Sequence, residues 1–322
     1  MDTITNIQRL VHVAKMYYYE GYTQEKIAKE LSISRTAVSM LLTEARSVGI
    51  VNIQIKDPYA NNEELANLLE EHFGLEKSIV VPTNINNEKL LLRIVASQAA
   101  RFAAELMSSY TSIGVSWGSA CYQFMKSFPE NTDLCDISVV PLIGGSPLLA
   151  REFQLNESIR NYAEKLRGTP VYIYSPGIVD SLNDKKHIME TMYMRAITEK
   201  WKSLDFAVIG IGLPPESYKY EQPQSDMRSN ADYIRQHPEI AIGDLCALWF
   251  NIKGDILDCD HNKKLIGIDE VGLRNTKKVL AIACGVNKTL SIIGALKTKL
   301  IHHFVTDEHT AKQVLKFAAE MD

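Results

Sequence analysis

One spacing near the N-terminus constrains the fold more than any other feature of this chain. Residues 23–39 follow the pattern T-Q-x-x-I-A-x-x-L-x-I-S-x-x-x-V-S, in which apolar residues recur at helical spacing on both sides of a short turn. With the apolar stripe of residues 5–20, the pattern predicts three helices, over 5–20, 24–31 and 35–48. Two short helices joined by such a turn form a helix-turn-helix.

The polar residues of this segment predict contacts with double-stranded DNA. Thr23 and Ser34 are suited to cap the second and third helices. The N-terminal half of the last helix reaches base edges in the major groove, where Arg35 could form two hydrogen bonds with guanine. Lys26 and Arg46 are better suited to phosphates. The predicted DNA-binding residues are Thr23, Gln24, Lys26, Ser34, Arg35, Thr36, Ser39 and Arg46.

Charge adds little to this prediction. Residues 1–60 carry seven basic and six acidic side chains, and the formal net charge of the 322-residue chain is −4. The alternative is a helical dimerisation domain with solvated polar faces. The spacing favours DNA binding. Helix-turn-helix proteins usually bind paired half-sites, so we expect at least a dimer.

Several features predict a cytoplasmic protein with no membrane partner. No apolar run approaches the roughly 18 residues that span a bilayer. The N-terminus has no basic region followed by an apolar stretch. The five cysteines are scattered, which favours a reduced compartment. The eight histidines have no metal-ligand spacing except a loose group of His302, His303 and His309, for which a surface or core role is favoured. We therefore expect no metal site and no cofactor.

Three domains are expected along the chain. Val51, Ile53 and Ile55 alternate with polar residues and predict a short strand, which Pro58 ends. Residues 61–73 then form an amphipathic helix that could pack on its own domain or on a second copy. The expected boundaries are 1–57 for the DNA-binding domain, 58–76 for a linker or oligomerisation helix, and 77–322 for an effector-binding domain.

Beyond residue 77, short apolar runs alternate with amphipathic segments. This alternation predicts a Rossmann-like α/β domain, with a parallel sheet covered by helices on both faces. Ligands bind at the carboxyl ends of the strands in such sheets. The predicted strands are 79–81, 112–116, 137–142, 171–174, 206–211, 245–252, 279–283 and 302–305, and the predicted helices are 87–107, 119–127, 154–166, 183–200, 288–297 and 306–321.

The loop after the strand 112–116 favours anion binding. Its small residues, in the sequence G-V-S-W-G-S, expose backbone N–H groups beside a helix N-terminus, which is a natural phosphate site. Ser116 and Ser119 could add hydroxyl donors, and Lys288 could balance the charge. A tight turn without ligand and a solvated surface lysine are the alternatives. Glycine-rich strand ends at 141–146, 175–177 and 210–214 suggest that one rim is shared.

Two acidic residues and one amide lie in or beside the predicted turns. Asp244 could accept hydrogen bonds from sugar hydroxyls, and Asn156 could both donate and accept. Asp307 could also face the rim, but capping of the last helix is the stronger interpretation.

Several segments, in the same order, resemble the SorC family of bacterial transcriptional regulators over essentially the whole chain. The resemblance is greatest to the sorbose-operon regulators within that family. The matching segments are T-Q-E-K-I-A-K-E-L (23–31), G-V-S-W-G-S (114–119), P-L-I-G-G (141–145), G-I-G (210–212), I-G-D-L (242–245), N-K-T-L-S-I-I-G-A-L (287–296) and V-T-D-E (305–308).

This resemblance implies a winged helix-turn-helix followed by a sugar-phosphate-binding domain similar to sugar-phosphate isomerases and deaminases. It implies a homotetramer that binds operator DNA, responds to a phosphorylated sugar or polyol, and regulates a carbohydrate catabolic operon. The residues implied to hold the phosphate are Ser116, Trp117, Gly118, Ser119 and Lys288, and those implied to face the sugar are Gly145, Asn156 and Asp244.

An isomerase or deaminase with an added DNA-binding domain is the alternative, because fold does not decide function. Such an enzyme needs a positioned acid and base near the sugar carbonyl. Asp244, Asp307 and His309 are candidates, but their spacing indicates no pair. We therefore predict a regulator that is not an enzyme and has no catalytic residues.

Overall fold

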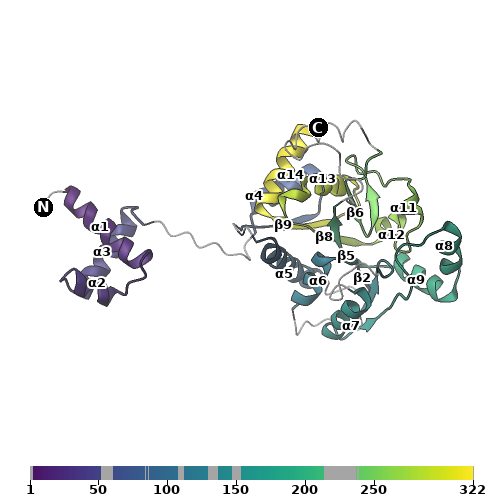
Figure 1. Ribbon diagram of the computed structural model, residues 1–322, viewed down its shortest axis with the longest axis horizontal. Coiled ribbons are helices and arrows are strands. Elements are labelled where there is room, and N and C mark those ends of the chain that lie inside the picture. The colour runs from purple at the N-terminus through teal and green to yellow at the C-terminus, as the bar shows by residue number, and fades with distance from the viewer. Residues whose placement is uncertain are drawn as a thin grey trace. The chain divides into compact units, whose positions relative to one another are not determined.

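The computed structural model forms two compact units, Met1–Lys56 and Asp57–Asp322 (Figure 1). The described part of each unit has its own buried apolar core. The residues that the structure describes are 3–51, 61–83, 85, 87–107, 112–129, 137–146, 154–213, 237 and 239–321.

The first unit contains the predicted helix-turn-helix. Its helices are α1 (Thr3–Tyr18), α2 (Gln24–Glu30) and α3 (Arg35–Ser47). Val13, Ile27, Val38 and Leu42 are buried between them, so the predicted apolar spacing does form a core. The predicted strand 51–55 lies outside the described residues, apart from Val51.

Both predicted caps of this unit are confirmed. The Thr23 hydroxyl accepts a hydrogen bond from the backbone N–H of Lys26 at 3.2 Å. The Ser34 hydroxyl accepts one from the N–H of Ala37 at 3.1 Å. Each hydroxyl satisfies a donor that the first turn of a helix leaves without a partner, and this fixes where α2 and α3 begin.

The second unit is built on a parallel sheet, as predicted. Neighbouring strands follow the order β1-β9-β8-β5-β2-β3-β4, and every pair along this path is parallel. Strands buried on both faces read as continuous apolar runs, as they do here. The strands are β1 (Lys77–Val81), β2 (Ser112–Val115), β3 (Ser138–Pro141), β4 (Thr169–Pro170), β5 (Phe206–Gly212), β8 (Lys278–Ile282) and β9 (His303–Asp307).

Helices cover both faces of this sheet. Helices α5 and α6 lie on one side of it, and α4, α13 and α14 lie on the other (Figure 1). The helices are α4 (Glu63–Phe73), α5 (Glu88–Leu106), α6 (Ser119–Ser127), α7 (Leu155–Lys165), α8 (Leu182–Met189), α9 (Met192–Lys202), α11 (Asp260–Lys263), α12 (Glu270–Asn275), α13 (Thr289–Lys297) and α14 (Glu308–Met321).

The amphipathic helix α4 packs on its own unit. Ala66, Leu69 and Phe73 are buried in the core of the second unit, against β1 and α14. The side chain of Asn61 accepts a hydrogen bond from the N–H of Val80 at 2.8 Å. The segment before α4 therefore also pairs with the edge strand β1, which covers an edge that another chain could otherwise extend.

The predicted strand 245–252 is wrong, because the segment forms a hairpin. Its strands are β6 (Gly243–Leu245) and β7 (Leu248–Phe250), which pair antiparallel, and β6 also pairs with the end of β5. Cys246 and Ala247 form the turn at φ +51° and +63°. A two-residue hairpin turn with positive φ at both positions is of type I′, which favours Asn-Gly. The Cys-Ala pair gave no turn signal.

The predicted strand 171–174 is also wrong, because β4 ends at Pro170. Side chains take up the backbone groups that a strand would pair. The Asn156 amide accepts from the N–H of Ile173 at 3.1 Å and donates to its carbonyl at 2.9 Å. On the neighbouring residues, the Tyr193 hydroxyl donates to the carbonyl of Tyr172 and accepts from the N–H of Tyr174.

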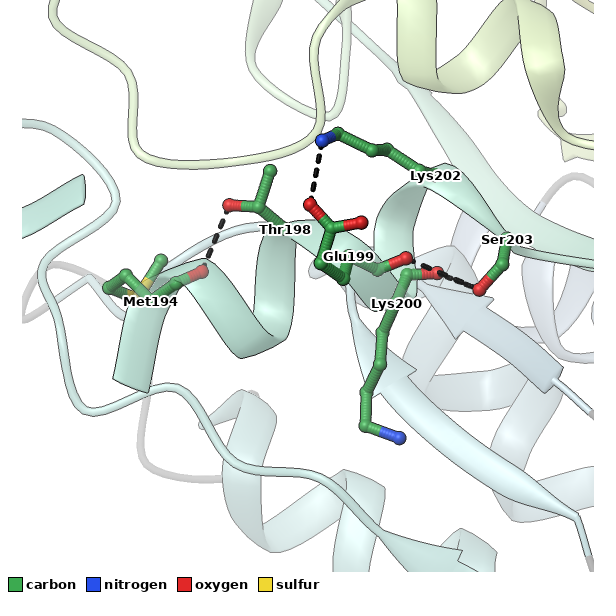
Figure 2. A network of polar contacts seen from close by, with 6 residues as sticks. All are labelled: Met194, Thr198, Glu199, Lys200, Lys202 and Ser203. Carbon is green, nitrogen blue, oxygen red and sulfur yellow. Dashed lines mark hydrogen bonds and ion pairs between the residues drawn. The ribbon is translucent and has the colours of Figure 1, made fainter. Parts of the chain in front are cut away.

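The predicted helix 183–200 is two helices, because Thr191 breaks it. The hydroxyl of Thr191 accepts from the N–H of Met194 and so begins α9 separately from α8. Figure 2 shows the C-terminal half of α9, where Glu199 and Lys202 form an ion pair at 2.7 Å and Ser203 donates to the Glu199 carbonyl at 3.2 Å. Ser203 also donates to the carbonyl of Lys200 at 3.4 Å, so it ends the helix with two terminal carbonyls satisfied.

Candidate functional site

The direction of the strand connections changes between β2 and β5. The chain leaves β2 for β3 on one side, whereas it leaves β5 for β8 on the other. Connections diverge at such a point, and ligands bind there beyond the carboxyl ends of the strands. The loop after β2 and the end of β5 at Gly212 are therefore the first places to look for a ligand site.

The loop after β2 combines buried and exposed groups. Ser116 is buried, and its N–H donates to the carbonyl of Val208 on β5 at 3.0 Å. Gly118 then turns the chain at φ +106°, a conformation that L side chains rarely adopt. Ser119 is exposed and begins α6. The first N–H groups of that helix have no partner within it, so they can bind an anion.

Lys288 reaches the end of β5 from a different loop. It ends a short 3-10 helix, Val286–Lys288, that leads into α13. Its ammonium group donates to the carbonyl of Ile211 at 2.7 Å. Burial lowers the pKa of Lys288, and Cys284 and Asp244 oppose that shift. A half-buried cation that donates to an uncharged backbone carbonyl can form a stronger hydrogen bond with an anion.

Asp244 faces the same strand end. It lies opposite Gly212 in the register of β6 and β5. A Cβ at Gly212 would lie 1.8 Å from Oδ1 of Asp244, so only glycine permits this approach. The other oxygen accepts from the N–H of Ala247 at 2.9 Å. Burial raises the pKa of Asp244 to about 6, against the opposing effects of that N–H and of Lys288.

Three cysteine thiols surround these charges, and the sequence pattern did not point to them. Burial raises the pKa of Cys121 and of Cys284 to about 12. It raises the pKa of Cys246 as well, although the hydroxyl of Ser116 opposes this. The thiols therefore stay neutral at physiological pH. Because scattered cysteines carry no spacing signal, only the fold could bring them together.

The predicted sugar-facing residues Gly145 and Asn156 belong to backbone pairing beside the rim. Gly145 accepts from the N–H of Gly177 at 2.6 Å and donates to the carbonyl of Ser175 at 2.9 Å. The Asn156 amide holds the backbone of Ile173 at both of its groups. Trp117 reaches this loop too, because its ring would lie 3.1 Å from a Cβ built on Gly177.

Asp307 caps the last helix, as expected. It accepts from the N–H of Thr310 at 3.0 Å. It also accepts from the N–H of Gly285 at 3.2 Å, so the cap of α14 ties down the loop that leads to Lys288. This second contact was not predicted, because a backbone donor leaves no mark in a sequence.

Most of the predicted DNA-binding residues are exposed on the first unit. Arg35 forms an ion pair with Glu25 at 3.6 Å, and the ammonium of Lys26 lies 3.4 Å from the centre of the Tyr22 ring. The prediction included neither Glu25 nor Tyr22. Gln24 is half-buried, whereas the other seven residues, Thr23, Lys26, Ser34, Arg35, Thr36, Ser39 and Arg46, are exposed.

The described part of the chain contains neither a candidate metal site nor a membrane-spanning helix. Its His, Cys, Asp and Glu side chains form no group of three or more that could hold a metal ion. None of its helices combines the length and the apolarity that crossing a membrane requires.

Comparison with known proteins identifies both units. Residues 57–316 match the Sugar-bind family, described as a "Putative sugar-binding domain", and residues 8–47 match region 4 of sigma-70. The chain is 29% identical to the sorbitol operon regulator of Klebsiella pneumoniae, over 98% of this chain and all of that protein. It is 28% identical to the deoxyribonucleoside regulator of Bacillus subtilis, over 96% of this chain and 97% of that one.

A solved structure of one of these relatives has a similar fold. The crystal structure of the full-length sorbitol operon regulator SorC from Klebsiella pneumoniae superimposes with a TM-score of 0.69 at 28% identity, covering 96% of this chain and 99% of that one. Each of these relatives is matched over at least 97% of its own length. The chain therefore belongs to the SorC family of sugar-binding transcriptional regulators.

Proposed function

We propose that this chain regulates a carbohydrate catabolic operon and that a phosphorylated sugar or polyol controls its affinity for operator DNA. The observation that carries the proposal is the ammonium of Lys288 at the end of β5, near the helix N-terminus that follows β2. A cation and a helix N-terminus at the point where strand connections diverge favour a phosphate over a neutral sugar.

The proposed binding step exchanges one hydrogen bond for a stronger one. Without effector, Lys288 donates to the uncharged carbonyl of Ile211. A phosphate oxygen is a charged acceptor, and hydrogen bonds between charged partners are roughly twice as strong. The N–H groups that begin α6 and the hydroxyls of Ser116 and Ser119 add donors. The neutral thiols nearby leave Asp244 as the acidic neighbour of Lys288.

The sugar part of the effector is proposed to meet Asp244. Its carboxylate can accept hydrogen bonds from hydroxyl groups, and Gly212 leaves room for it. Gly145 and Asn156 are proposed to act from the neighbouring rim, where they bind the backbone of residues 173–177. Trp117 and Gly118, in the loop after β2, are proposed for the phosphate.

Operator binding is proposed to use Arg35, Thr36 and Ser39 at bases and Lys26 and Arg46 at phosphates. The chain would act in the cytoplasm as a homo-oligomer, a tetramer in the form that the resemblance implies. Effector binding would alter the spacing of the DNA-binding units, so that each ligand changes the affinity for the other.

A thermal-shift screen tests the effector class. We expect one phosphorylated sugar or polyol to raise the melting temperature while its unphosphorylated form does not, because a ligand that binds only the folded state stabilises it. Hexitol 6-phosphates are the first probes, with free hexitols and inorganic phosphate beside them. Stabilisation by a free sugar alone would contradict the phosphate proposal.

The variant Lys288→Ala identifies the phosphate contact. It removes a charge-assisted hydrogen bond, and we expect the variant to bind the phosphorylated effector roughly tenfold more weakly or worse in calorimetry. Lys316→Ala is the matched control, because Lys316 is an exposed lysine on α14. Equal affinities of the two variants would place the phosphate elsewhere.

Catalysis is the alternative function and has its own test. Purified protein is incubated with hexose and hexosamine phosphates, and product is followed by chromatography. We expect no turnover. A rate that disappears in Asp244→Ala would instead favour an isomerase or deaminase.

A further inference from the structure

The turn that follows Asp244 is held in a strained backbone conformation. Cys246 and Ala247 both have positive φ, at +51° and +63°, and neither is glycine. An L side chain in this region crowds the following carbonyl. Both residues are nevertheless buried. Such a turn persists only where neighbouring groups hold it, and strain of this kind gathers at ligand sites.

His261 holds the tip of this turn. Its Nε2 lies 2.9 Å from the carbonyl oxygen of Ala247. Because a carbonyl only accepts, this nitrogen carries the proton and donates it. The imidazole also stacks on the indole of Trp249, with ring centres 3.8 Å apart and planes 8° apart. Stacking on Trp249 therefore holds the face of the imidazole, and the hydrogen bond to Ala247 holds its Nε2 edge.

Asn262, the next residue on α11, holds the strand after the turn. Its carbonyl oxygen accepts from the N–H of Trp249 at 2.9 Å, and its amide donates to the carbonyl of Trp249 at 3.0 Å. The side-chain amide of Asn262 thus pairs with both backbone groups of Trp249, as a neighbouring strand would do. Together His261 and Asn262 attach the one-turn helix α11 to the turn and to β7.

The residue that His261 holds is the one that orients Asp244. The Ala247 N–H donates to Oδ2 of Asp244, and the Ala247 carbonyl accepts a hydrogen bond from Nε2 of His261. On its other side the turn lies near the loop after β2, since the hydroxyl of Ser116 opposes the rise in the pKa of Cys246. The turn therefore lies between α11 and the proposed effector site.

We propose that His261 and Asn262 are positioning residues of the effector site, which hold the Cys246–Ala247 turn so that Asp244 faces the hydroxyl groups of the bound sugar. The inference rests on the proposed function, since it assigns Asp244 to hydroxyl recognition. Neither residue touches the effector. Their effect passes through the Ala247 backbone and should change recognition of the sugar but not of its phosphate.

The test compares two probes on the full chain. Calorimetry measures the binding of D-sorbitol 6-phosphate, which carries hydroxyl groups, and of inorganic phosphate, which does not. For His261→Ala we expect D-sorbitol 6-phosphate to bind roughly fivefold more weakly or worse, as for the loss of one hydrogen bond, and phosphate to change by less than about twofold. Lys263→Ala is the control, because Lys263 is exposed on the same helix and pairs with Asp258.

Two further variants separate positioning from simple destabilisation. His261→Gln keeps a donor but not the stacked ring, and we expect an intermediate affinity. His261→Ala combined with Ala247→Gly should regain part of the lost affinity, because glycine adopts positive φ without strain. Hydrogen exchange of the peptide 243–250 follows the turn without any ligand, and His261→Ala should speed it whereas Lys263→Ala should not.

The outcomes distinguish this inference from the function on which it rests. Equal binding of D-sorbitol 6-phosphate by the His261→Ala and Lys263→Ala variants would overturn the inference alone. Equal weakening of the binding of both probes would also overturn the inference, because it would indicate general disruption of the site. If the unaltered chain binds no phosphorylated compound in the screen, the proposed function and the inference both fail.

Discussion

At the scale of single residues, Asp244 and Lys288 hold the two charges of the proposed site, and burial shifts both toward their neutral forms. The pKa of Asp244 rises to about 6 and that of Lys288 falls. The free site therefore holds its charges at a cost in stability. Such a cost is common at functional sites, where perturbed pKa values gather.

This cost predicts a dependence of stability on pH. The folded-state pKa of Asp244, about 6, exceeds the ordinary value of 3.8 for an aspartate side chain. The folded state therefore binds the proton more tightly, and stability falls as pH rises from about 4 to above 6. Asp244→Asn cannot ionise. Its unfolding free energy relative to the unaltered chain should rise over that window by about 2 kcal/mol, somewhat less than the full shift implies.

Denaturant unfolding at pH 4, 5, 6 and 7 measures this difference. The three tryptophans, Trp117, Trp201 and Trp249, all lie in the second unit, so their fluorescence follows the unfolding of that unit. A difference that does not change with pH would show that Asp244 titrates at an ordinary value.

At the scale of elements, short helices here begin and end where single side chains satisfy backbone groups. The helix α3 begins at the Ser34 hydroxyl, and Thr191 separates α8 from α9. Caps matter most in a unit as small as the first, whose core is correspondingly limited. The orientation of the recognition helix therefore depends on Ser34 as well as on the buried Val38 and Leu42.

The cap of α3 gives a prediction about stability alone. Ser34→Ala leaves the N–H of Ala37 without its partner and should destabilise α3 by about 1 kcal/mol. Ser34→Asp keeps an acceptor and should retain most of the stability. Hydrogen exchange across residues 35–47, measured without DNA, reports the opening of this helix. Equal exchange in all three proteins would mean that water replaces the hydroxyl at no cost.

At the scale of the whole molecule, the first unit is proposed to bind DNA and the second to bind the effector. Arg35→Ala should weaken binding to an operator sequence selected with the unaltered chain by roughly 5- to 150-fold, the range for one arginine–guanine pair. It should leave effector binding unchanged. Lys288→Ala should do the reverse. Anisotropy at one fixed salt concentration measures operator affinity, since that affinity depends strongly on salt.

Coupling between the units must be reciprocal. If effector changes operator affinity by some factor, operator must change effector affinity by the same factor. Both factors are measured on the unaltered full chain, the second by calorimetry with and without operator. A factor of one in both directions would indicate that the sugar-binding unit does not control DNA binding.

Much of the architecture follows from local pattern. The apolar spacing of residues 5–48 is enough for the three helices and their core, because a helix-turn-helix depends on contacts close in sequence. The strand ends at 115, 141 and 212 were located within a residue or two, since continuous apolar runs mark buried parallel strands. The errors at 171–174 and 245–252 have other origins. Side chains bind the backbone of residues 172–174 in place of a neighbouring strand, and the turn at Cys246–Ala247 contains neither asparagine nor glycine.

The sequence by itself determined the helix-turn-helix, the parallel sheet, the glycine-rich loop after β2 and the candidacy of Lys288 and Asp244. Each depends on residue type and on spacing within about twenty residues. Only the tertiary structure decided that Lys288 donates to Ile211, that Asn156 pairs with a backbone, and that His261 reaches the turn beside Asp244. Those contacts join segments through backbone carbonyls and N–H groups, which every residue possesses. Their pairing is therefore set by packing and leaves no mark in the sequence.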